Sequence, residues 1–94
     1  MIQQATSRAY APKTAGLREL GVYTLPDGSE YVASRLYSEG CSLYTTPAWE
    51  LFAGAELQVD TRGRLLRRGL PTRWNVYDLR DTGRTARYPA PVIG

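Results

Sequence analysis

Arginine is the residue type whose clustering in this sequence could support chemistry. Eight arginines and only two carboxylates lie in residues 61–94, which gives that segment a net charge of +6. Residues 1–60 carry four basic and seven acidic side chains, a net charge of −3. Clustered guanidinium groups create a field that reaches about 10 Å into solvent at ordinary ionic strength. This charge separation predicts an anionic partner without identifying it.

Arginines and interleaved aromatic residues of this segment form a candidate anion-binding strip. The planar arginine fork fits phosphate and carboxylate groups, and exposed tryptophan or tyrosine rings can stack on unpaired bases. Arg64 and Arg68 are expected to be neutralised by Asp60 and Glu56 across a hairpin. The candidates that remain are Arg62, Arg67, Arg73, Trp74, Tyr77, Arg80 and Arg84, with Arg87 beyond them.

Nucleic-acid binding through this strip is an alternative hypothesis that charge patterning alone supports. The chain contains no aromatic RNP consensus, GxxG clamp, basic zipper or zinc knuckle, and a charge run is usually a solvated surface.

The segment also resembles the tail of small bacterial proteins in Gly63-Arg64-Leu65-Leu66, Gly69, Pro71-Thr72, Trp74 and Asp81-Thr82-Gly83. That resemblance carries no information on activity.

The residue inventory argues against an enzyme. The chain has no histidine and one cysteine, Cys41, so serine or cysteine triads, histidine metal sites and an internal disulfide are excluded. We therefore expect no cofactor, no metal and no catalytic activity, with Cys41 as a packing residue. A remote alternative is phosphodiester cleavage, in which Glu56 or Tyr77 accepts a proton. In that case the charged transition state would be stabilised by Arg67, Arg73 or Arg80.

The amino-terminal segment shows no targeting signal. Residues 1–13 contain no apolar run of signal-peptide length, and no stretch approaches the about 20 apolar residues that span a bilayer. These observations predict a cytoplasmic protein without a membrane partner.

Three glycine-ended triplets predict three hairpins. Pro26-Asp27-Gly28, Ser38-Glu39-Gly40 and Thr61-Arg62-Gly63 each match a type I turn closed by a left-handed glycine. The intervals between them predict strands near residues 17–25, 29–37, 41–45, 55–60 and 64–68, with a sixth short strand around Trp74 and Val76. Between the third and fourth strands, a helix is expected from Pro47 to Ala53, capped by Thr46. Its Trp49 and Phe52 should plug an open end of the sheet.

Turn geometry also predicts which residues share a face. In the first hairpin Tyr23 opposes Tyr31 and Glu19 opposes Arg35 on one face, while Val22 opposes Val32 on the face expected to be the core. The second hairpin places Leu43 on the tyrosine face and Tyr44 on the valine face. The two hairpins therefore disagree about which side is dry, and strong curvature could bury parts of both.

The tyrosine-rich face is a candidate protein-contact surface, formed by Tyr23, Tyr31, Arg35 and Tyr37. The alternative is that these tyrosines fill the core or half-buried sheet positions.

The sequence as a whole predicts a mainly β domain at residues 17–87, between a flexible amino-terminal arm at 1–16 and an extended tail at 88–94. We expect a small curled antiparallel sheet, or a partly open SH3-like barrel, of five to six short strands with one short helix. An α+β arrangement with the helix packed on one sheet face is the alternative. The expected function is noncatalytic binding through protein contacts or self-association, ahead of nucleic acid.

Overall fold

The computed structural model describes residues 17–37 and 40–88, without the side chains of residues 35–37. The arm predicted at residues 1–16 and most of the predicted tail, residues 89–94, lie outside the described part. Within it, seven strands form one antiparallel sheet in the order β6-β5-β4-β3-β2-β1-β7, which confirms the mainly β prediction. The likeness to SH3-like barrels stays a prediction.

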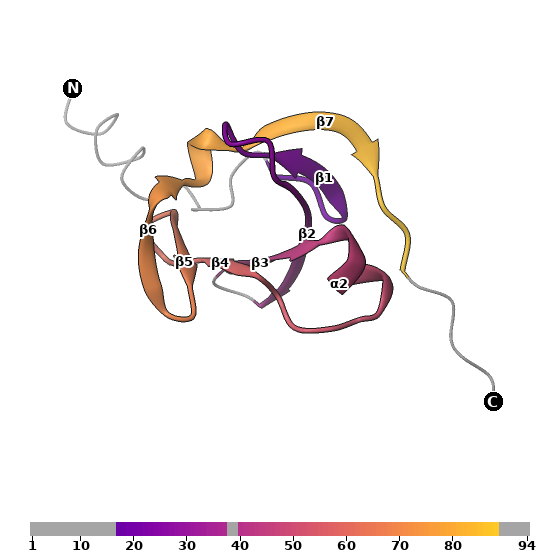
Figure 1. The fold of residues 1–94 in the computed structure, drawn as a ribbon, viewed down its shortest axis with the longest axis horizontal. Helices are drawn as coiled ribbons and strands as arrows, with labels where there is room; N and C mark the ends of the chain where they lie inside the picture. The colour runs from indigo at the N-terminus through magenta and orange to yellow at the C-terminus, as the bar shows by residue number, and fades with distance from the viewer. Residues whose placement is uncertain (1–16, 38–39, 89–94) are drawn as a thin grey trace, which may run out of the picture.

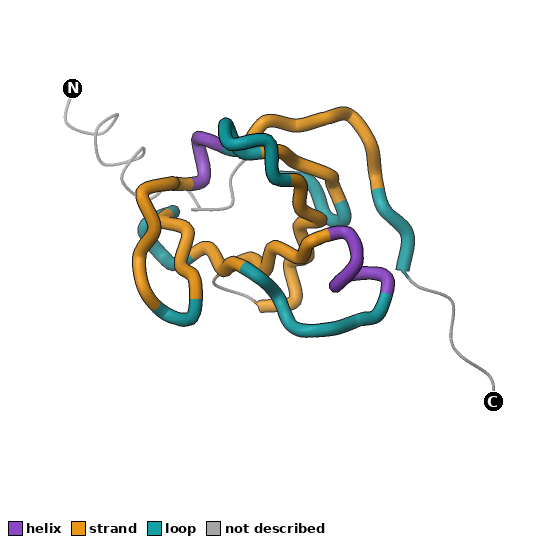
Figure 2. Tube along the Cα trace, viewed as in Figure 1, coloured by secondary structure: helices purple, strands orange, loops and turns teal. Residues whose placement is uncertain are grey.

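The elements follow one another as hairpins, interrupted by one short helix and one 3-10 turn (Figures 1 and 2). There is one strand more than the five to six predicted, because the chain beyond residue 69 forms two full strands. The elements are β1 (Gly21–Thr24), β2 (Glu30–Tyr37), β3 (Gly40–Thr45), α2 (Thr46–Glu50), β4 (Leu57–Val59), β5 (Arg64–Arg67), β6 (Leu70–Asn75), the 3-10 turn η1 (Val76–Asp78) and β7 (Arg80–Thr85).

The sheet is curled but not closed. Strands β6 and β7 form its two opposite edges, yet only η1 and its flanking residues separate them along the chain. The sheet must therefore curl until its edges approach each other, and Figure 1 shows the strands as a ring around a central space. The curl gives the sheet an inner and an outer face.

Both faces of the sheet carry buried residues, which agrees with the expectation that curvature could bury parts of both. The inner cluster draws residues from β1 to β5 and from η1, including Tyr23, Tyr31, Leu43, Leu57 and Leu65. The outer cluster consists of Val22, Val32, Tyr44 and Trp49. The prediction that the valine face forms the main core is wrong, because the curl turns the tyrosine face inward.

The predicted pairing of the first hairpin is confirmed near its centre, whereas the second hairpin keeps the predicted faces but not the predicted register. Tyr23 pairs with Tyr31 and Val22 with Val32. Tyr44 pairs with Val32, and Leu43 packs in the same cluster as the tyrosines. The three-residue loop predicted at residues 26–28 thus gave the correct register, but the loop predicted at residues 38–40 is wrong, because Gly40 already pairs with Tyr37.

Two of the three predicted turn glycines adopt the left-handed conformation. Gly28 has φ 90° and Gly63 has φ 85°, and their N–H groups donate to Leu25 and Asp60. Gly40 does not, although β2 and β3 do pair around it. A Cβ at Gly40 would lie 2.6 Å from the Val59 carbonyl oxygen, so close packing against β4 explains this glycine.

Helix α2 is shorter than predicted and covers a face rather than an end of the sheet. Thr45, not Thr46, caps it by accepting a hydrogen bond from the Ala48 N–H at 3.3 Å. Phe52 has φ 54°, which stops the helix before residue 53. Trp49 packs into the outer cluster, whereas Phe52 is 57% exposed. Trp49 and Phe52 therefore do not plug an open end of the sheet, and the helix packs on a sheet face as in the α+β alternative.

Candidate anion-binding site at the β5–β6 hairpin

A two-residue turn that was not predicted connects β5 to β6. Arg67 pairs with Leu70, which leaves Arg68 and Gly69 as the turn. Their φ values are 55° and 80°, both left-handed, as a type I′ hairpin turn requires. The strand predicted at residues 64–68 therefore ends one residue early, at Arg67, and Arg-Gly departs from the Asn-Gly or Asp-Gly that type I′ turns favour. Gly69 was the signal that could have located the turn, because it lies between the apolar pairs Leu65-Leu66 and Leu70-Pro71.

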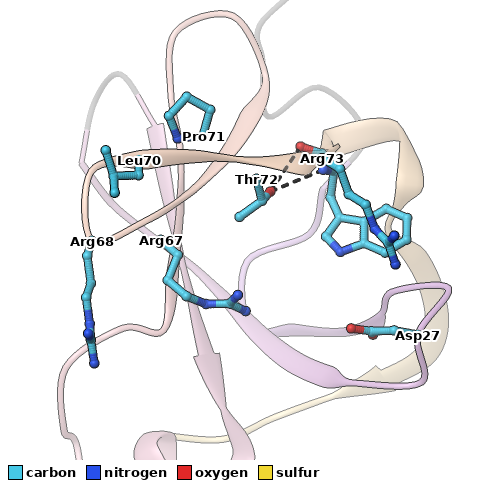
Figure 3. A pocket seen from close by; sticks show the side chains of 8 residues that line it. Asp27, Arg67, Arg68, Leu70, Pro71, Thr72 and Arg73 are labelled. Atoms are coloured by element: carbon cyan, nitrogen blue, oxygen red, sulfur yellow. Dashed lines mark hydrogen bonds between the residues drawn. The ribbon is translucent and has the colours of Figure 1, made fainter.

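A surface pocket of about 640 Å³ lies beside this hairpin (Figure 3). Three arginines reach it from β5, from the turn and from β6, and the β1–β2 turn contributes one carboxylate. Of the predicted anion-binding residues, Arg67, Arg73 and Trp74 line the pocket. The other lining residues are Asp27, Arg68, Leu70, Pro71 and Thr72.

Hydrogen bonds hold β6 in place along the pocket. The Thr72 hydroxyl donates to the Leu65 carbonyl oxygen at 2.7 Å and accepts from the Trp74 N–H at 3.1 Å. The guanidinium carbon of Arg73 lies 4.4 Å from the centroid of the Trp74 ring, a cation–π contact. Arg73 therefore covers one face of Trp74, which leaves that face closed to a stacking base.

Asp27 places a negative charge on the pocket rim. Hydrogen bonds from the Ser29 hydroxyl and then from the Ser29 N–H lower the pKa of Asp27, and the positive charge of Arg73 lowers it further. Asp27 is thus ionised at neutral pH and partly balances Arg73.

Arg67 is neutralised in place of Arg68. The Nε of Arg67 donates to Glu56 Oε2 at 3.0 Å, and both side chains are about half exposed. The predicted pair of Glu56 with Arg68 is not found, because the chain has already entered the turn at Arg68 and left the strand register. Within the described residues, Arg68 makes no hydrogen bond or ion pair.

The other predicted arginines do not join these three in one strip. Arg64 pairs with Asp60 at 3.1 Å, as predicted, and Arg84 forms an ion pair with Glu30. Arg62 lies in the β4–β5 turn, while Arg80 begins β7. Tyr77 is 79% exposed on η1 and does not line the pocket. The pocket therefore gathers only part of the expected band of arginines, because acidic partners hold Arg64 and Arg84 and because Arg62 lies at the opposite end of β5.

Arg84 and Arg87 line a second surface pocket, of about 420 Å³, beside α2. Glu30 and Glu50 line the same pocket, so its charges are balanced. Trp49 closes its base and donates from its ring nitrogen to the Arg87 carbonyl oxygen at 2.8 Å. This pocket lacks the positive excess of the first.

The candidate protein-contact face is occupied by the core. Tyr23 and Tyr31 are only 2% and 3% exposed, so the structure supports the alternative in which these tyrosines fill the interior. The side chains of Arg35 and Tyr37 lie outside the described part of the protein. No contact surface is therefore assembled from the tyrosines that the structure places.

Among residues 17–37 and 40–88, no group of three Cys, Asp or Glu side chains is arranged to hold a metal ion. In the same ranges, no helix has the length and apolar character needed to cross a membrane. Cys41 is buried in the inner cluster.

Comparison of the chain with models of protein families, with curated proteins and with solved structures finds no match.

Proposed function

We propose that this protein is a noncatalytic binding domain that holds an acidic segment of a partner protein at the β5–β6 hairpin. The observation that carries the proposal is the composition of the pocket there. Three arginines line the pocket: Arg67, Arg68 and Arg73. Two exposed apolar residues line it with them, Leu70 at 69% exposure and Pro71. Positive charge beside exposed apolar surface suits a peptide that combines carboxylates with apolar side chains.

The charge pattern favours a short acidic segment over nucleic acid. Glu56 and Asp27 stand beside Arg67 and Arg73, and these carboxylates would repel a continuous phosphate backbone. A peptide can place individual carboxylates on the arginines and apolar groups elsewhere. The covered face of Trp74 also removes a stacking surface that an unpaired base would use.

The sheet edges favour binding by side chains over strand addition. Pro71 in the edge strand β6 has no N–H to donate to an added strand. At the other edge, the N–H groups of Gly83 and Arg84 donate to the side chains of Asp81 and Thr82. Both edges are thus partly blocked, as is common in proteins that avoid edge-to-edge pairing.

The catalytic alternative gains no support from the pocket. Glu56 accepts a hydrogen bond from Arg67, and Tyr77 is not among the lining residues. Neither proton acceptor named for phosphodiester cleavage therefore faces the arginines as a free group. Self-association and the compartment inferred from the sequence stay predictions.

Nuclear magnetic resonance titration of the whole protein tests the proposal. The probes are a short peptide that alternates glutamate with leucine, the matched peptide with glutamine at each glutamate, and a single-stranded oligonucleotide. We expect the glutamate peptide to shift amide signals of residues 67–74, with much weaker effects from the glutamine peptide. The interaction should weaken as salt increases, because exposed charges are screened.

Two results would contradict this function. Absence of pocket shifts with the glutamate peptide would remove the proposed ligand class. Larger, salt-sensitive shifts with the oligonucleotide would instead support the nucleic-acid hypothesis.

A further inference from the structure

We infer that Arg68 is the principal carboxylate-binding residue of the pocket, held at the hairpin tip in a strained backbone conformation. The inference rests on the proposed function and assigns the binding within it to one side chain. Neither the expected ion pair with Glu56 nor the strand position predicted for Arg68 is found.

Backbone strain is the first observation. Arg68 has φ 55°, a conformation in which the Cβ of an ordinary residue crowds the following carbonyl oxygen. Asparagine, aspartate and glycine tolerate it far better, and they dominate this position of type I′ turns. An arginine here makes the fold less stable than an asparagine would.

The chain contains a second Arg-Gly turn, in which the arginine has no left-handed backbone and so serves as a comparison for Arg68. Arg62 precedes Gly63 in the β4–β5 turn, and only the glycine has a positive φ there. The Arg62 N–H donates to Asp60 Oδ1 at 2.8 Å. Of the two Arg-Gly turns only the second strains its arginine, so the strain does not follow from the Arg-Gly sequence. Leu20 and Phe52 are the other described non-glycine residues with a positive φ, and neither lines the pocket.

Availability of the side chain is the second observation. Arg67 donates to Glu56, and Arg73 lies on Trp74 and close enough to Asp27 to lower its pKa. Among the described residues, no carboxylate pairs with Arg68. In Figure 3 the Arg67 side chain extends toward the space between the hairpin and Asp27, whereas the Arg68 side chain points away from the other lining residues. Arg68 can therefore accept a carboxylate without first breaking an ion pair.

Backbone strain is common at functional positions. A substitution there would stabilise the fold, but it would remove a side chain that is needed for binding. Exposed Leu70 lies directly across the turn from Arg67 and follows the two turn residues in the chain. A glutamate bound to Arg68 would thereby bring a nearby apolar side chain of the peptide within reach of Leu70. Binding and stability should consequently change in opposite directions when Arg68 is replaced.

Fluorescence anisotropy with the labelled glutamate–leucine peptide, together with thermal unfolding, tests this inference. We expect Arg68→Asn to raise the melting temperature by roughly 3 to 6 °C. The same variant should bind the peptide about tenfold more weakly, because it loses a charge-assisted hydrogen bond. Arg68→Lys should keep the melting temperature near that of the original protein and weaken binding about threefold, since charge stays but the planar fork is lost.

Arg62→Asn is the matched control. It removes one positive charge from an Arg-Gly turn outside the pocket, so binding should change less than about twofold. Full binding by Arg68→Asn would overturn the inference and leave the proposed function standing, as would a lower melting temperature of that variant. Failure of the original protein to bind the peptide would overturn the inference and the proposed function together.

Discussion

At the scale of single residues, glycine serves two different purposes in this fold. Gly28 and Gly63 are required by their left-handed backbone at hairpin turns. Gly40 has no such conformation, but its missing Cβ leaves room for the carbonyl of Val59 on the neighbouring strand. Strands β3 and β4 can therefore approach closely at this point only with glycine.

Replacement of Gly40 by alanine should reveal this steric requirement. The added Cβ would lie 2.6 Å from a backbone oxygen, which cannot rotate away. We expect Gly40→Ala to lower the free energy of unfolding by about 1 to 3 kcal/mol in urea titrations. Gly54→Ala is the control, because nothing lies within 4 Å of its Cβ position and its φ is not left-handed. A loss of stability no greater than that of the control would contradict the close-approach explanation.

At the scale of elements, one arginine ties β7 to the segment before β1. Arg18 donates from Nε and Nη2 to the two Asp81 carboxylate oxygens at 2.8 and 2.7 Å. Its Nη1 also donates to the Thr85 hydroxyl at the far end of the strand. These bonds from Arg18, with the Gly83 N–H bond to the same carboxylate, lower the pKa of Asp81 from 3.8 to about 2.

The lowered pKa of Asp81 makes a prediction about acid stability. A carboxylate whose pKa falls on folding contributes stability above its unfolded value of 3.8 and loses it as the pH falls toward 2. Stability measured by urea unfolding should therefore decline across that interval, and Asp81→Asn should reduce the slope. The same variant should be less stable than the original protein at neutral pH. Both side chains are exposed, so the effect should shrink at high salt.

Glu50→Gln provides the control for this pH experiment. Glu50 is an exposed carboxylate for which no ion pair is found within the described residues. Like Asp81→Asn, this variant removes one carboxylate, but it breaks no ion pair found among the described residues. If Asp81→Asn had the same slope as the original protein, the bond to Arg18 would not contribute to stability.

At the scale of the whole molecule, η1 links the two edges of the curled sheet. This single turn connects the two edge strands and is closed by a capping box between Asn75 and Asp78. Val76 points into the inner cluster and is buried, and its N–H donates to the Gly63 carbonyl oxygen at 2.7 Å. Tyr77, the next residue, faces solvent. Burial of Val76 thus anchors the connection between the edges to the core.

Adjacent substitutions in η1 should therefore behave very differently. We expect Val76→Ala to lower the free energy of unfolding by about 2 kcal/mol, through lost burial and a residual cavity. Tyr77→Ala should change it by no more than about 0.5 kcal/mol, because that side chain is exposed. Urea unfolding of both variants measures the difference. Equal effects would show that η1 is not anchored through Val76.

Local rules predicted the hairpins well and the late strands poorly. Pairing of Tyr23 with Tyr31 followed from loop length, because one extra residue would turn every side chain to the opposite face. The β5–β6 hairpin was missed because Arg68 occupies a turn position that arginine seldom takes. That error also misassigned the partner of Glu56 and so removed the wrong arginine from the candidate site.

The sequence by itself determined the β class, the positions of two left-handed turns and the facing of the first three strands, because these depend on neighbours in the chain. Tertiary structure decided which face became the main core, since that depends on how far the sheet curls and where its edges meet. It also decided which arginines are free. Arg67, Arg73 and Arg84 acquire acidic neighbours that register and curl bring beside them, while the turn holds Arg68 apart.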